Sequence, residues 1–106
     1  MVDFWAPWCI VCRELDAPLA AVAAKFAGRA RVVRVNVDWS SRVASRYDVR
    51  SLPTLLVFAH GEMVSRSIGG ASETDLEEML TAQLAPAPVT VAAAGAVPAP
   101  AAGAGR

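Results

Sequence analysis

Residues 2–12, VDFWAPWCIVC, decide the fold of this 106-residue chain. They join a short apolar run, Val2–Trp5, to a turn that ends in the only two cysteines of the chain, Cys9 and Cys12. The apolar run is typical of the end of a buried strand. Beyond the cysteines, apolar side chains recur at helical spacing, so we expect a helix that begins at or beside the cysteines and ends near Ala27.

The rest of the chain predicts a strand, a short helix, two strands and a last helix, which together indicate an α/β domain with a mixed sheet. Gly61 marks a hairpin between the last two strands. Ser72, followed by Asp75, forms a capping-box pattern before the last helix. The side chains expected to face the interior are Leu15, Leu19, Val22, Ala23 and Phe26 in the first helix, Val33, Val35 and Val37 in the second strand, Val43 and Tyr47 in the short helix, and Leu76, Met79, Leu80 and Leu84 in the last helix.

Composition limits the chain to one small domain. Its residues are 55% hydrophobic, and ten basic residues balance ten acidic ones. The basic residues are scattered over several elements, so we expect no nucleic-acid binding, and no apolar run reaches the length of a membrane span. We expect residues 1–84 to form the domain. Residues 85–106 are rich in Ala, Pro and Gly and predict a disordered tail, with an extended spacer as the alternative.

Three interpretations compete for the cysteine pair. A closed zinc site takes four Cys or His ligands, and the chain adds only His60, so we expect no bound metal. A structural disulfide would close too small a loop to restrict the unfolded chain much. At a helix start, free N–H groups favour a thiolate, and only a thiolate attacks disulfides. Redox exchange therefore explains more of the sequence context of the pair than the other two interpretations. Cys9 would attack a substrate disulfide, and Cys12, one turn later, would resolve the mixed disulfide.

Several motifs resemble those of the thioredoxin family in order and spacing, namely VDFWAPWCIVC, VNVD, SLPTLLVF, HGE and IGG. The resemblance covers Val2 to about Leu84 and implies a thioredoxin-like fold, N-terminally truncated, with about four strands and three helices. It implies a protein-disulfide reductase, a monomer that acts on disulfide-containing proteins and holds no bound cofactor. An external thioredoxin reductase would reduce its Cys9–Cys12 disulfide. No secretory signal precedes the motifs, which favours a cytoplasmic location.

The resemblance also implies a role for each matching residue. Cys9 becomes the exposed attacking thiolate and Cys12 the buried resolving thiol. Asp3 becomes a buried carboxylate that shuttles the proton of the resolving thiol, the alternative being a solvent-exposed aspartate at a strand end. Pro53 becomes a cis-proline that faces the cysteines. The implied substrate-binding residues are Trp8, Ile10, Val11, Leu52, Pro53 and Gly69, and the implied supporting residues are Trp5 and Arg34.

The chain departs from the family pattern at four places. Ile10 and Val11 replace the usual Gly-Pro pair, which leaves the direction of any change in reduction potential open. Pro18 lies one position later than the usual helix proline. Arg34 stands where the family often has lysine, and it cannot lose its proton. The first strand and helix of the family are missing, so residues 31–37 become an edge strand. We expect the natural chain to begin upstream of Met1; a trimmed domain or a covering partner are the alternatives.

Two rival functions remain open. An envelope thiol:disulfide interchange domain fits the unusual dipeptide between the cysteines. A non-catalytic thioredoxin-like module would instead bind an extended peptide in the groove near Trp8, Leu52 and Pro53 without turnover.

Overall fold

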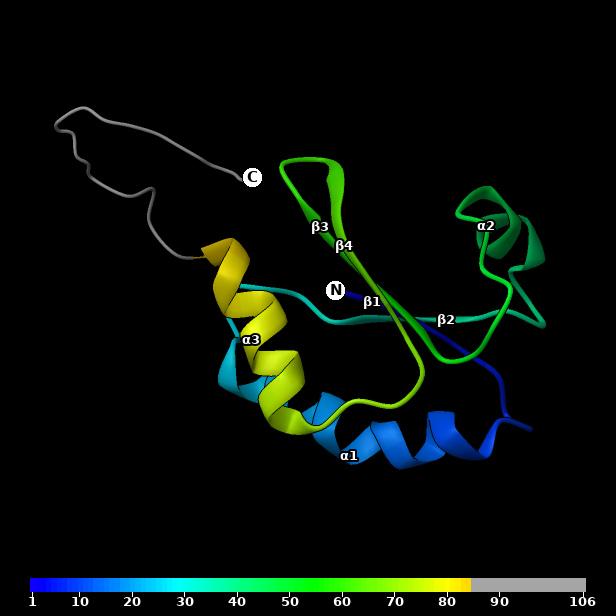
Figure 1. The fold of residues 1–106 in the computed structure, drawn as a ribbon, viewed down its shortest axis with the longest axis horizontal. Coiled ribbons are helices and arrows are strands. Elements are labelled where there is room, and N and C mark those ends of the chain that lie inside the picture. Colours follow the sequence, from blue (N-terminus) through cyan, green and yellow to red (C-terminus); the bar gives the residue numbers. More distant parts are fainter. Residues whose placement is uncertain (85–106) are drawn as a thin grey trace, which may run out of the picture.

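The computed structural model describes residues 1–84, and the predicted tail at residues 85–106 lies outside the described residues. Figure 1 shows the described elements, which follow the order expected from the sequence. Their bounds are β1 Val2–Trp5, α1 Ile10–Lys25, β2 Val33–Asn36, α2 Ser41–Arg46, β3 Thr54–Ala59, β4 Glu62–Ile68 and α3 Glu73–Leu84. Pro18 lies inside α1. No helix within residues 1–84 has the length and apolar character needed to cross a membrane.

The four strands form one mixed sheet in the order β2-β1-β3-β4, with β2 and β4 as its edges. β1 runs parallel to β2 and antiparallel to β3, which pairs antiparallel with β4. His60 and Gly61 have φ angles of 55° and 81°, which lets the β3–β4 hairpin turn within two residues. The ends of β1, β2 and β4 and the start of β3 therefore meet at one end of the sheet.

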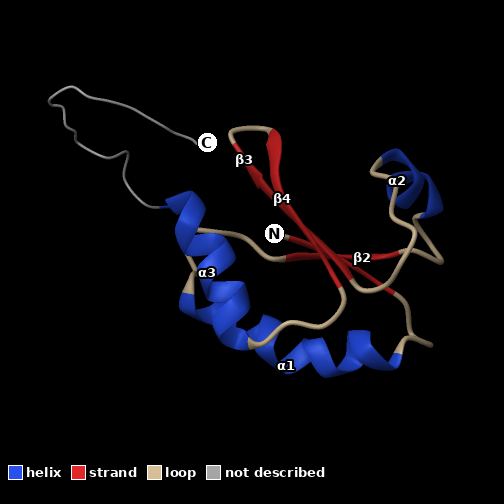
Figure 2. Ribbon diagram, in the orientation of Figure 1, coloured by secondary structure: helices blue, strands red, loops and turns tan. Residues whose placement is uncertain are grey.

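Helices cover the two faces of the sheet unequally, as Figure 2 shows. α1 and α3 pack on one face and α2 lies on the other. The larger core cluster consists of Met1, Leu15, Leu19, Val22, Phe26, Leu55, Val57, Leu76 and Leu80. The smaller cluster joins Phe4 and Leu56 of the sheet to Ala44 of α2. The fold is thus the predicted α/β domain.

Three expected interior positions are wrong. Val43 is 41% exposed, because Ala44, the next residue around the short helix, faces the sheet instead. Val33 is 44% exposed because β2 is an outer strand of the sheet. Leu84 is 38% exposed at the end of α3, beyond the core cluster. Tyr47 does face inward, with its ring edge-on to Phe58 at a centroid distance of 5.5 Å.

The capping box before α3 is confirmed. The backbone N–H of Asp75 donates to Ser72 Oγ at 3.1 Å, and the N–H of Ser72 donates to Asp75 Oδ2 at 3.1 Å. Each side chain therefore satisfies one backbone N–H group at the start of α3.

Replacing Ser72 by alanine removes one of these two bonds. We expect Ser72→Ala to lower the free energy of unfolding by about 1 kcal/mol in urea denaturation. Thr81→Ala, on the exposed side of the same helix, is the matched control and should stay within about 0.5 kcal/mol of the wild type. Equal effects of the two substitutions would contradict a stabilising cap.

Candidate active site

The cysteines lie where β1 ends and α1 begins. They form a disulfide with a Cα–Cα distance of 5.2 Å. Cys9 is the N-cap of α1, and its sulfur accepts the backbone N–H of Cys12 at 3.1 Å. The Cys9 N–H in turn donates to the carbonyl of Ala6 at 3.1 Å, which fixes the turn. The start of α1 therefore presents an N–H group to the Cys9 sulfur, an arrangement that favours a thiolate once the disulfide is reduced.

Exposure differs between the two cysteines less than the resemblance implies. Cys9 is 8% exposed and Cys12 is 1% exposed. Cys12 is buried as expected, whereas Cys9 is far from the exposed residue that we expected, because its sulfur is bonded to Cys12 and caps the helix. Trp8, Ile10 and Val11 surround it with exposed apolar side chains. The Cys9 sulfur is therefore flanked in the chain by exposed apolar side chains.

Pro53 and Gly69 lie at the same end of the sheet as the cysteines. The Leu52–Pro53 peptide bond is cis, as the resemblance implies. The Gly69 N–H donates to the Pro53 carbonyl at 2.9 Å, and the φ of Gly69 is 94°, a conformation that favours glycine. Val11 Cγ1 lies 3.4 Å from the place of a Cβ atom on Gly70, so the start of α1 touches the segment after β4.

The Leu52 side chain does not lie among the exposed apolar side chains next to Cys9. Its side chain is partly buried and packs with the core cluster beneath α2. The structure thus places the Leu52 side chain in the core on the α2 face, while its backbone precedes the cis bond.

Trp8 is held by a residue that the sequence reasoning missed. The indole Nε1 donates to Asp38 Oδ2 at 3.2 Å, and the Asp38 N–H donates to Asn36 Oδ1 at 2.9 Å. The Trp8 ring remains 65% exposed. The sequence did hold a sign of this contact. Asp38 ends the motif VNVD and directly follows β2, which runs parallel to β1, so it lies at the same end of the sheet as Trp8.

Asp3 is fully buried in the central strand β1, which excludes the solvent-exposed alternative. It lies opposite Leu55 of β3 and Arg34 of β2. Arg34 Nε donates to Asp3 Oδ2 at 3.2 Å, and Asp3 Oδ1 has no hydrogen-bond partner. Burial raises the pKa of the Asp3 carboxyl, although the hydrogen bond and charge of Arg34 oppose the rise.

Arg34 and Trp5 lie together beside this carboxylate. The Arg34 guanidinium carbon is 4.3 Å from the centre of the Trp5 ring, within cation–π range. Arg34 Nη2 also contacts Asp16 Oδ1 of α1 at 2.8 Å. Asp16 is a second residue that the sequence reasoning missed, because its helix position gives no sign of a partner on β2.

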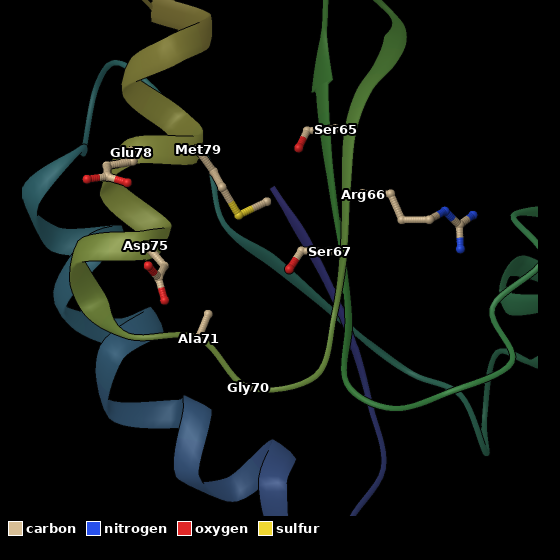
Figure 3. Close-up of a pocket in the computed structure, with 8 residues that line it drawn as sticks. All are labelled: Ser65, Arg66, Ser67, Gly70, Ala71, Asp75, Glu78 and Met79. Atoms are coloured by element: carbon tan, nitrogen blue, oxygen red, sulfur yellow. The ribbon is translucent and has the colours of Figure 1, made fainter.

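A separate open pocket of about 440 Å³ lies between β4 and α3 (Figure 3). Ser65, Ser67 and Met79 line it, and the Arg66 side chain points away from α3. Arg66 instead donates to the carbonyl of Tyr47. No cysteine lines this pocket, so it is distinct from the disulfide. In the part of the chain that the structure describes, no three His, Cys, Asp or Glu residues gather as a metal site.

A CxxC disulfide at a helix N-terminus, beside a cis-proline and a buried carboxylate, defines a thiol:disulfide oxidoreductase. Comparison with known proteins agrees with this class. The family model described as Thioredoxin matches residues 1–82. The chain belongs to the thioredoxin family, and its activity is dithiol–disulfide exchange with protein disulfides.

Individual relatives show the extent of the similarity. The chain is 40% identical over 84 residues to thioredoxin 1 of Nostoc sp., across 79% of this chain and 78% of that protein. It is 40% identical over 80 residues to the thioredoxin of Porphyra purpurea, across 76% of this chain and 75% of that one. A mutant thioredoxin from Halobacterium salinarum has a similar structure, with a TM-score of 0.76, 33% identity, and coverage of 82% of this chain and 75% of that chain.

The raised pKa of Asp3 predicts how stability depends on pH. The folded state holds the Asp3 proton more tightly than the unfolded state, so the free energy of unfolding falls as pH rises from the unfolded pKa, about 3.9, through the folded pKa. An asparagine at this position has no such proton. We therefore expect the stability of Asp3→Asn, relative to the wild type, to improve as pH rises above about 4 and to level off above the folded pKa of Asp3, in urea denaturation of the oxidised proteins. A constant difference would contradict the raised pKa.

Proposed function

We propose that the reductase acts through Cys9 as the nucleophile and Cys12 as the resolving thiol. The observation that carries this order is the N-cap position of Cys9, whose sulfur accepts the Cys12 N–H at 3.1 Å. The larger exposure of Cys9, 8% against 1%, also supports attack from Cys9. A thiolate is stabilised best at the residue that faces the free N–H groups of the helix.

The exchange has two steps. In the reduced protein, the Cys9 thiolate attacks a substrate disulfide, a mixed disulfide forms, and one substrate sulfur leaves as a thiolate and takes a proton. The Cys12 thiolate then attacks the Cys9 sulfur, the Cys9–Cys12 disulfide forms, and the second substrate sulfur leaves. Two electrons pass from the dithiol to the substrate.

Asp3 is the proposed base for the second step. A buried thiol such as Cys12 ionises poorly because burial disfavours its charged form. Asp3 faces the same side of the sheet as α1, since its register neighbour Leu55 packs in the cluster with Leu15 of α1. Its unpartnered Oδ1 is an acceptor that can take the Cys12 proton.

The proposed substrate surface is the apolar rim around Cys9. It consists of the exposed side chains of Trp8, Ile10 and Val11 and of the backbone at Leu52, Pro53 and Gly69. Exposed apolar surface of this kind fits a segment of a substrate protein that carries apolar residues beside its disulfide.

Family membership supports proposals for the partners and the location. We propose that an external thioredoxin reductase returns the disulfide to the dithiol, that the domain works as a cytoplasmic monomer, and that residues 1–84 form a thioredoxin-like domain. The match of the family model to residues 1–82 supports the last point.

Cysteine variants test the order of the two steps. With insulin as substrate and dithiothreitol as reductant, Cys9→Ser should show no turnover above dithiothreitol alone. Cys12→Ser should accumulate a mixed disulfide through Cys9, seen by mass spectrometry and removed by reductant. Trapping through position 12 in Cys9→Ser would reverse the assignment. Insulin binding without turnover by the folded wild type would favour the non-catalytic module.

Asp3→Asn tests the proposed base. Loss of general base catalysis should slow reductase turnover on the order of 100-fold at pH 7. The defect should shrink at pH 9, where a larger fraction of the thiol ionises without a base. A defect that is the same at both pH values would contradict proton transfer to Asp3.

A further inference from the structure

Arg34 is fixed by three groups, two on β1 and one on α1. Its Nε donates to Asp3 Oδ2 on β1 at 3.2 Å, its Nη2 contacts Asp16 Oδ1 on α1 at 2.8 Å, and its guanidinium stacks on Trp5 at 4.3 Å. A single exposed ion pair contributes little, but contacts that form a network hold a side chain in one position. Arg34 therefore has a defined orientation although its side chain is 39% exposed.

The contact with Asp3 is incomplete for an arginine. A guanidinium beside a carboxylate usually donates two parallel hydrogen bonds, one to each oxygen. Here Nη2 contacts Asp16, and Asp3 Oδ1 is left buried without a partner. A buried acceptor without a hydrogen bond costs free energy, so an unpaired oxygen at this position calls for an explanation.

Asp16 is well placed to cause this arrangement. It follows Cys12 by one helical turn, and residues four apart lie side by side on a helix. Within residues 1–84, the charged groups that act on the Asp3 carboxyl are Arg34 from β2 and Asp16 from α1. β3, the other neighbouring strand, has no titratable residue.

We propose that Asp16 is a positioning residue for the resolving step: it holds Arg34 Nη2 away from Asp3, so that one carboxylate oxygen of Asp3 stays free to accept the proton of Cys12. This proposal rests on the role of Asp3 in the proposed function. In the step itself, the Cys12 S–H bond breaks, Asp3 Oδ1 takes the proton, and the resulting thiolate displaces the substrate sulfur from Cys9.

Removing the Asp16 charge should release Arg34 toward Asp3. With Nη2 free, the guanidinium can donate to both oxygens of Asp3, which occupies the acceptor and lowers the pKa of Asp3. The negative charge of Asp16 raises the pKa of Asp3, so its loss also lowers that pKa. A weaker and occupied base should slow the resolving step.

The test compares Asp16→Asn with Glu14→Gln in insulin reduction between pH 5 and pH 9. Glu14 is an exposed acid on the same helix, so its variant removes the same charge without touching Arg34. For Asp16→Asn we expect turnover to fall about three- to tenfold at pH 7 and the acid limb of the profile to move to lower pH. Asp16→Glu should recover part of the rate, and Glu14→Gln should match the wild type.

A second measurement does not depend on turnover. Titration of the Asp3 carboxyl by carbon NMR in the oxidised proteins should give a lower pKa in Asp16→Asn than in Glu14→Gln. If the two variants agree in rate, acid limb and Asp3 titration while Asp3→Asn is slow, the role of Asp16 is wrong and the proposed function stands. If Asp3→Asn turns over like the wild type at pH 7, Asp3 is not the base and both assignments fail.

Discussion

The capping of α1 by the Cys9 side chain is the interaction on which the site depends. It fixes where the helix begins and therefore which sulfur faces the free N–H groups. β1 is a central strand, with β2 on one side and β3 on the other. The loop after β1 therefore brings the cysteines between the segment after β2, which supplies Asp38, and the segment before β3, which supplies Pro53. An edge strand would have only one such neighbour.

Burial of Asp3 destabilises the fold, because the carboxylate loses its hydration, and it also raises the pKa of the carboxyl. An apolar side chain in the centre of β1 would pack without losing hydration, whereas a buried carboxylate is costly unless it is paired. Arg34 supplies one hydrogen bond from the neighbouring strand and leaves half of the carboxylate unsatisfied. A buried carboxyl with a raised pKa and a free acceptor oxygen suits the proton transfer that we propose for Asp3.

Local patterns in the sequence were enough to predict the elements, their order and the capping box at Ser72. The family resemblance added the cis bond before Pro53 and the burial of Asp3. The contacts of Trp8 with Asp38 and of Arg34 with Asp16 were not predicted, because each joins side chains that are far apart in the sequence. The spacing of apolar residues also could not show which side of α2 faces the sheet. The helix has only 6 residues, too few to define one apolar face.

The Ile10–Val11 pair shows how the site keeps its geometry without a proline between the cysteines. α1 still begins at Ile10, so the cap at Cys9, rather than a preset φ angle, determines the start of the helix. Val11 faces Gly70, where a Cβ atom would lie 3.4 Å from Val11 Cγ1, so the two segments pack closely. Ile10, next to Cys9 in the chain, is 70% exposed and adds apolar surface at the start of α1. Since apolar neighbours offer the Cys9 sulfur no hydrogen bond, the backbone N–H of Cys12 at the start of α1 supplies its polar contact.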